Sequence, residues 1–238
     1  EGDRNNDKGG FVRRATFVKE FRKEHPDMLL FDCGDISQGT PYYNMFQGEV
    51  EVKMMNEMKY DAMTIGNHEF DFDLDNMARL FRMADFPVVC ANYDVSATVL
   101  KDLVKPYVVF ERDGVKIGVL GLGCQLEGMV QANKCVGVVY NDPVTVANEV
   151  AAVLKEKEGC DVVVCLSHLG VQYDENQLIP KTRNIDVVLG GHSHTFMKGP
   201  KTLLNMDGKN VSLMHTGKSG IYVCLLYTSD AADEARSV

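Results

Sequence analysis

Short apolar runs alternate with amphipathic stretches along most of this chain. The apolar runs have the length and the β-branched content of buried strands, and they cover residues 28–31, 61–65, 87–90, 162–166 and 185–189. The amphipathic stretches have the period of helices buried on one side, and they cover residues 10–24, 49–59, 74–84, 143–158 and 174–181. A chain in which strands and helices alternate in this way is predicted to be an α/β protein.

Two turn sequences indicate antiparallel strands as well. An Arg-Asp-Gly turn at residues 112–114 and a Met-Asp-Gly turn at residues 206–208 each lie between two apolar runs. Turn residues in this position are typical of β-hairpins. The predicted sheets therefore contain antiparallel as well as parallel pairs.

Polar side chains follow several of the predicted strands at the point where each strand ends. In α/β proteins the loops at these carboxyl ends converge and bind ligands. The side chains placed there are Asp35, Asn67, His68, His168, His192 and His194. Chance is a poor explanation for four of the six histidines at such positions. Because His, Asp and Asn without Cys are ligands expected for Zn, Mn or Fe, the pattern predicts a metal centre.

Structural interpretations of the same residues stay open at this point. Residues 66–71 also suit a turn that leads into a helix N-terminus, since Gly and Asn favour turns and acids favour the first helical turn. His25 is most simply a residue at the C-terminal end of a helix. His215 is expected to be a structural residue within its apolar run.

Taken together, the segments at residues 34–40, 66–71, 167–170 and 191–194 resemble the calcineurin-like metallophosphoesterases, and within them the 5'-nucleotidase branch. They occur in the order of that family and with compatible spacing. The resemblance implies a four-layer α/β/β/α sandwich of two mixed sheets flanked by helices. It also implies that the functional site lies at one edge of this sandwich.

The resemblance implies two divalent metal ions, which would be Zn, Mn or Fe. Asp35 would bridge both ions. Asn67, His168 and His192 would complete the coordination of one ion. His194 would bind the other ion together with an Asp-x-His motif of the family.

The resemblance also implies roles for residues that do not bind metal. His68 would be a catalytic residue that stabilises the phosphoryl group and protonates the leaving alkoxide. Asp71 would orient its ring. Asn92 follows the predicted strand at residues 87–90 and would contact the substrate. Glu69 is compatible with helix capping or with support of the site.

Both ends of the chain depart from the pattern of the family. The Asp-x-His motif is expected upstream of Glu1, so residues 1–223 are predicted to form a catalytic domain that lacks its first strand, with a weak or absent second ion. Residues 224–238 resemble the translation of a sequencing-library adapter and are predicted to be a non-native tail. The alternative is a native strand followed by a polar tail.

Charge and composition exclude some classes of partner. A net charge of −9 gives no basic footprint for a nucleic acid polymer, whereas bound cations would attract a phosphate substrate locally. No apolar run reaches the roughly 20 residues of a membrane-spanning helix. The seven cysteines contain no Cys-x-x-Cys pair and indicate no disulfide framework.

The sequence therefore predicts a two-metal phosphoester hydrolase, in the first place a 5'-nucleotidase that releases phosphate from nucleoside monophosphates. The alternatives are a phosphodiesterase or phosphatase that acts on cyclic nucleotides or sugar phosphates, and a metal-binding fragment without turnover. The expected partner is a small phosphoester, with nucleotide selection by a separate C-terminal domain. The resemblance alone suggests a periplasmic or cell-surface location.

Overall fold

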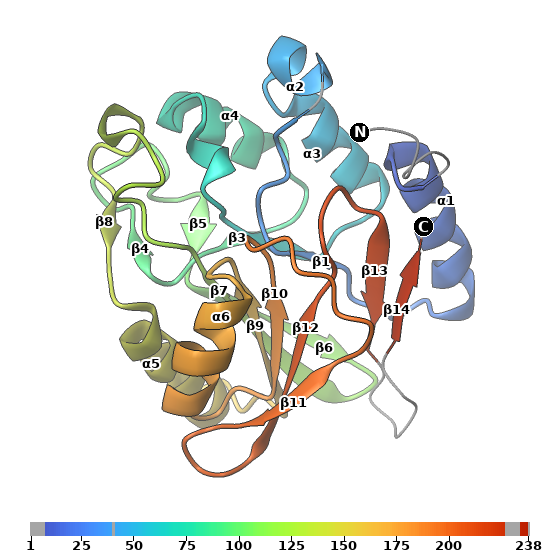
Figure 1. Cartoon of the computed structure of the whole chain (residues 1–238), viewed down its shortest axis with the longest axis vertical. Coiled ribbons are helices and arrows are strands. Elements are labelled where there is room, and N and C mark those ends of the chain that lie inside the picture. The colour runs from blue at the N-terminus through green and yellow to red at the C-terminus, as the bar shows by residue number, and fades with distance from the viewer. Residues whose placement is uncertain (1–7, 40, 227–233, 238) are drawn as a thin grey trace.

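The computed structural model describes residues 8–39, 41–226 and 234–237 (Figure 1). Two sheets form its centre. The smaller sheet contains only parallel pairs, in the order β1 (Phe31–Asp32), β2 (Ala62–Thr64), β3 (Val88–Val89) and β5 (Val104–Lys105). The larger sheet has the order β11 (Lys201–Leu204), β12 (Asn210–His215), β10 (Val187–Gly190), β9 (Val162–Ser167), β7 (Val115–Leu122) and β6 (Tyr107–Arg112).

Pairing in the larger sheet is mixed. Its four inner strands are parallel to one another, and the two edge strands β6 and β11 are antiparallel to their neighbours. Both predicted hairpins are therefore confirmed, and they supply the two edges of this sheet. The expectation of mixed pairing does not hold for the smaller sheet, because neither hairpin joins it.

Helices cover the outer faces of the two sheets. The helices on the side of the smaller sheet are α1 (Phe11–Glu24), α2 (Pro41–Phe46), α3 (Glu49–Glu57) and α4 (Leu74–Met83). Those on the side of the larger sheet are α5 (Pro143–Glu156) and α6 (Val171–Tyr173), the latter continuing into a π-helical turn, η4 (Asp174–Leu178), and a 3₁₀ turn, η5 (Ile179–Lys181). The predicted helix over residues 174–181 is thus replaced by these two turns.

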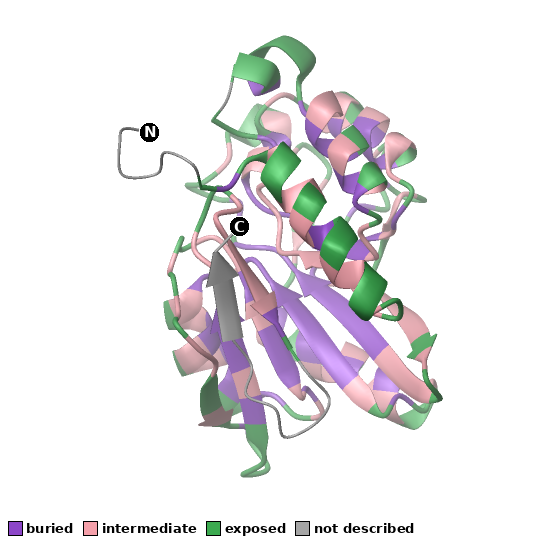
Figure 2. Cartoon of the chain, turned by 90° about the vertical axis from the view of Figure 1, so that its right-hand side faces the viewer, coloured by how far each residue is buried: buried purple, intermediate pink, exposed green. Residues whose placement is uncertain are grey.

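Three separate cores follow from the alternation of side chains along the strands. In β9, Val163 and Cys165 face α5, whereas Val164 and Leu166 face the smaller sheet. In β2, Met63 packs toward α3 and α4. Apolar contacts thus lie between helices and sheet on both sides and between the two sheets. Figure 2 shows buried residues along the central strands. These layers confirm the predicted α/β sandwich.

The other elements are short. A two-stranded sheet pairs β4 (Tyr93–Asp94) with β8 (Val139–Tyr140), and 3₁₀ turns occur at η2 (His68–Phe70) and η3 (Ala132–Lys134). The predicted strand at residues 28–31 is observed only from its last residue onward, as β1 (Phe31–Asp32). The backbone N–H of Leu30 donates to the side chain of Asp61 and not to the backbone of a neighbouring strand. The other predicted helices are confirmed to within two residues of their observed ends.

In the C-terminal segment, β13 (Tyr222–Leu225) pairs antiparallel with β14 (Glu234–Ser237). This pairing does not test whether residues 224–238 are native, and their assignment as a tail stays a prediction. Of the predicted tail, residues 227–233 and 238 lie outside the described part of the chain.

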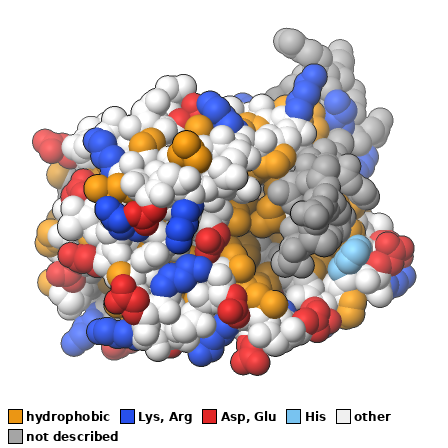
Figure 3. Space-filling view, turned by 90° about the horizontal axis from the view of Figure 1, so that it is seen from below, with side chains coloured by type: hydrophobic (Ala, Val, Ile, Leu, Met, Phe, Trp, Pro, Cys, Tyr) orange, Lys and Arg blue, Asp and Glu red, His pale blue; other side chains and the backbone are white. Residues whose placement is uncertain are grey.

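The surface agrees with the charge analysis. On the face shown in Figure 3, Lys and Arg side chains of the described residues are interspersed with Asp and Glu and form no continuous basic area. Among the described residues, no helix combines the length and the hydropathy that crossing a membrane requires. All seven cysteines lie in the described part of the chain, and no two of them form a disulfide.

Candidate metal centre

The carboxyl ends of β1, β2, β9 and β10 bring four predicted ligands together. Ligand atoms of Asp35, His168 and His192 all lie within 4.8 Å of one another. Asn67 joins them, because its Oδ1 atom lies 3.0 Å from Nδ1 of His192. These residues are far apart in the sequence, and the parallel strands bring them to one edge of the sandwich.

The ring of His168 has the orientation of a metal ligand. It is fully buried, and its Nδ1 atom lies 2.5 Å from the carbonyl oxygen of Cys33, to which it donates. The Nε2 atom therefore faces Oδ2 of Asp35 at 3.0 Å, yet it makes no well-formed hydrogen bond. A buried ring nitrogen beside a carboxylate, with its other nitrogen fixed by a carbonyl, fits a divalent cation between the two side chains.

The charges within the cluster favour the ionised form of Asp35. Burial would raise the pKa of Asp35, but the nearby His168 and the backbone N–H of His68 lower it below its ordinary value. The same carboxylate raises the pKa of His168 against the effect of burial. Burial, followed by the charge of His168, lowers the pKa of His192. A lowered pKa favours the ionised carboxylate, the form in which Asp35 can bind a cation.

Glu69 joins the two loops that carry Asp35 and Asn67. Its buried carboxylate accepts hydrogen bonds from the backbone N–H groups of Gly66 at 2.6 Å and of Asp35 and Ile36 at 2.9 Å. Burial and the neighbouring charge of Asp35 raise the pKa of Glu69 to about 7. The sequence left capping and support of the site as alternatives for this residue, and the structure shows support.

Close packing at the centre requires glycine at position 66. A Cβ atom there would lie 2.2 Å from Oδ1 of Asp35 and 2.6 Å from Cε1 of His168. Gly34 has a φ of +86°, and its own Cβ would lie 2.5 Å from the backbone nitrogen of Gly66. Backbone and ligands thus approach more closely than any side chain at residue 66 permits.

His68 lies beside the cluster with its ring bonded to Asp71. Its Nδ1 atom lies 3.1 Å from Oδ1 and 3.0 Å from Oδ2 of Asp71. The predicted pairing of this His with the acid three residues later is thus present in the structure. Sequence analysis missed a third member, Tyr43 on α2, whose hydroxyl donates to Oδ2 of Asp71 at 2.8 Å.

Two further predicted site residues also lie outside the cluster. His194 is exposed, on the same loop as His192, and is not part of the group of three ligands among the described residues. Asn92 is fully buried, and its side chain donates to the carbonyl and accepts from the N–H of Gly123, both at 2.8 Å. The structure gives Asn92 a structural role at this junction, since both ends of its amide are occupied. The substrate contact predicted for Asn92 is not tested by these hydrogen bonds and stays a prediction.

A buried polar network lies behind the ligand loops. The hydroxyl of Ser167 donates to Oδ1 of Asp174 at 2.6 Å, and Nε2 of His215 lies 2.9 Å from Oδ2 of the same acid. All three residues are at least 99% buried. The structural role predicted for His215 is confirmed, whereas no sequence motif indicated its partner Asp174.

The fold and the cluster together define an α/β protein with a candidate metal centre at the carboxyl ends of its strands. The sequence matches the family model of the calcineurin-like phosphoesterases over residues 7–196, which include every residue of the cluster. The chain belongs to this family. The resemblance to its 5'-nucleotidase branch is confirmed by the relatives described next.

Three relatives show the similarity. The chain is 35% identical over 193 residues to a snake venom 5'-nucleotidase of Crotalus adamanteus, covering 79% of this chain and 32% of that protein. It is 33% identical over 228 residues to the trifunctional nucleotide phosphoesterase YfkN of Bacillus subtilis, covering 82% and 16%. The structure of a 5'-nucleotidase precursor from Thermus thermophilus matches with a TM-score of 0.88 and 29% identity, covering 97% and 49%. The chain thus spans less than half of each relative.

Proposed function

We propose that this chain is the catalytic part of a metal-dependent phosphomonoesterase that releases phosphate from nucleoside 5'-monophosphates. The observation that supports the proposal is the convergence of Asp35, Asn67, His168 and His192 beside the half-buried ring of His68. Two of the relatives described above carry the name 5'-nucleotidase, which favours a nucleotide as the substrate.

Asp35, Asn67, His168 and His192 would hold one divalent ion, and the donor set suits Zn, Mn or Fe. A second ion would bind to Asp35 and to His194, together with the Asp-x-His motif of the family. Bound at such a site, divalent ions polarise phosphoryl oxygens and lower the pKa of a coordinated water. The protein positions these ligands in advance, through Glu69 and through the carbonyl of Cys33.

His68 would act directly on the substrate. Asp71 engages Nδ1, so the Nε2 atom is left for the substrate. With both ring nitrogens protonated, Nε2–H would hydrogen-bond the phosphoryl group and give its proton to the leaving alkoxide, which leaves the neutral ring protonated on Nδ1. Asn67, the residue before His68, is part of the cluster. The backbone of this short segment would therefore hold the ring of His68 at a fixed position relative to the metal centre. The half-buried position of His68 would leave its ring accessible to a substrate that enters from solvent.

Phosphate release tests the proposal. We expect AMP to be hydrolysed faster than a cyclic nucleotide or a sugar phosphate when Mn²⁺ or Zn²⁺ is added, and the measurement compares this chain with a version extended upstream through the Asp-x-His motif. Turnover of AMP in the extended version supports a nucleotidase. Faster hydrolysis of the cyclic nucleotide would favour a phosphodiesterase instead. The similarity to YfkN, which is named a trifunctional nucleotide phosphoesterase, is compatible with this outcome.

The variant His68→Ala separates catalysis from metal binding. We expect it to lower kcat for AMP by roughly 10²–10⁴-fold and to leave the metal content unchanged, because the ring is not part of the ligand group. His25→Ala, at the C-terminal end of α1, is the matched control and should leave kcat unchanged. Loss of metal from His68→Ala would make this residue a ligand and contradict its assigned role.

A further inference from the structure

We propose that Tyr43 is a positioning residue for His68, acting through Asp71, and this inference rests on the function proposed above. Tyr43 Oη donates to Oδ2 of Asp71 at 2.8 Å, and the same carboxylate engages Nδ1 of His68 at 3.0–3.1 Å. The three side chains form a continuous chain of hydrogen bonds from α2 to the ring beside the metal centre.

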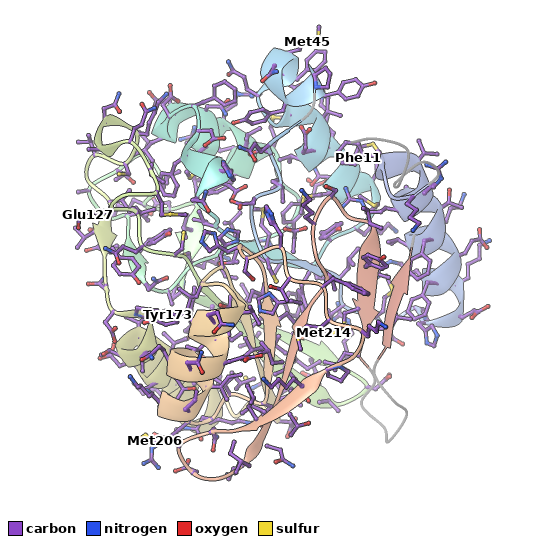
Figure 4. The ribbon with its side chains drawn as sticks, in the orientation of Figure 1. Phe11, Met45, Glu127, Tyr173, Met206 and Met214 are labelled. Atoms are coloured by element: carbon purple, nitrogen blue, oxygen red, sulfur yellow. The ribbon has the colours of Figure 1, made fainter. Side chains whose placement is uncertain are left out.

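The burial of Tyr43 sets it apart from its neighbours on the same short helix. Its side chain is 8% exposed, whereas Tyr42 is 55% and Met45 is 72% exposed. Met45 lies at the outer end of α2, away from the sheets (Figure 4). The ring of Tyr43 also packs on Phe72, with 5.1 Å between the ring centroids. Tyr43 is therefore the residue by which α2 reaches the loop of Asp71.

The hydrogen bond from Tyr43 restricts a carboxylate that would otherwise be mobile. The side chain of Asp71 is 33% exposed, so solvent competes for its oxygens. With Tyr43 bound to Oδ2, the carboxylate is held facing Nδ1 of His68, which keeps the proton of the neutral ring on Nδ1. The Nε2 atom then points to the substrate as the atom that exchanges a proton. Neither Asp71 nor Tyr43 touches a proposed metal ligand side chain in these contacts.

The helix that carries Tyr43 is itself anchored to α4. The side chain of Asn76 donates to the carbonyl of Gln47, and the side chain of Arg79 donates to the carbonyl of Phe46. These bonds fix the end of α2 relative to the segment that follows Asp71. The position of Tyr43 thus depends on the folded helices, and removal of its hydroxyl removes the hydrogen bond to Asp71 without removing the anchor.

The test uses the variant Tyr43→Phe, which keeps the ring and removes the hydroxyl. Nitrogen-15 spectra of the imidazole rings in the whole chain report which nitrogen of His68 carries the proton, and they need neither metal nor substrate. We expect wild-type His68 to be protonated on Nδ1, and the ratio of the two neutral tautomers to fall roughly 3- to 10-fold in Tyr43→Phe, as for the loss of one hydrogen bond. Tyr42→Phe, on the exposed side of the same helix, should leave the ratio unchanged.

Activity provides the second readout. In the extended chain, Tyr43→Phe should lower kcat for AMP by a similar roughly 3- to 10-fold with KM unchanged, and it should have no further effect when Asp71→Asn is already present. An unchanged tautomer ratio in Tyr43→Phe, or a neutral wild-type ring protonated on Nε2, would overturn the inference. Absence of AMP hydrolysis together with the expected tautomer shift would overturn the proposed function and leave the positioning by Tyr43 intact.

Discussion

Alanine in place of Gly66 is expected to lower the affinity of the metal centre for Mn²⁺ or Zn²⁺ by about 100-fold, the upper end of the range for disruption of groups that orient metal ligands. The added Cβ atom would lie 2.2 Å from Oδ1 of Asp35 and 2.6 Å from the ring of His168. Neither ligand can withdraw freely, because the backbone of Asp35 is bonded to Glu69 and the ring of His168 to the carbonyl of Cys33. The clash must therefore displace at least one of the two ligands.

Isothermal titration with Mn²⁺ measures this effect. Gly199→Ala is the matched control, since a Cβ atom at residue 199 would meet nothing within 4 Å and its φ lies outside the left-handed region. The control should bind metal as the wild type does. Equal affinity of Gly66→Ala and the wild type would show that the close approach of Asp35 and His168 to residue 66 is not needed for metal binding.

Removal of the buried carboxylate in Asp174→Ala is expected to destabilise the fold by about 2–6 kcal/mol, because two buried partners are each left unsatisfied at a cost of about 1–3 kcal/mol. The partners are the hydroxyl of Ser167 and Nε2 of His215, both at least 99% buried. The network joins the ends of β9 and β12 to η4, and the ring of His215 lies against Gly190 at the end of β10. Its loss should therefore also loosen the strand ends that carry His168 and His192.

Urea denaturation of the variant and of Glu175→Ala measures the difference. Glu175 is the next residue along η4, and it pairs with Lys201 in a partly exposed ion pair at 2.9 Å. Such a pair contributes about 0–1 kcal/mol, so this control should lose little stability. A loss in Asp174→Ala no larger than in the control would mean that the buried network contributes no more than a surface contact.

Most elements of the fold were predictable, since buried strands and amphipathic helices have clear periods in this sequence. The helix at residues 143–156 also had a marked start, and Asp142 does accept from the backbone N–H of Thr145. The helix α2 was missed because six residues are too few for a helical period to show. The turns at residues 174–181 were predicted as one helix, since apolar spacing does not distinguish π and 3₁₀ turns from an α-helix.

Residue types at strand ends indicated six candidate side chains, and four of these converge in the candidate metal centre. The supporting residues were not predictable in the same way, because their roles depend on contacts between distant segments. Glu69 bonds to a loop more than 30 residues away in the sequence, and Tyr43 reaches Asp71 across a separation of 28 residues. Asn92 was assigned to the substrate by resemblance, and only the three-dimensional structure places its amide against Gly123.

The most direct test of the metal centre is anomalous X-ray scattering from a crystal of this chain equilibrated with Mn²⁺ or Zn²⁺. We predict a peak about 2.0–2.3 Å from a carboxylate oxygen of Asp35, Nε2 of His168 and a ring nitrogen of His192, the usual range for such ligands, and its disappearance in Asp35→Asn. A crystal with metal bound elsewhere and none between these three side chains would contradict the account.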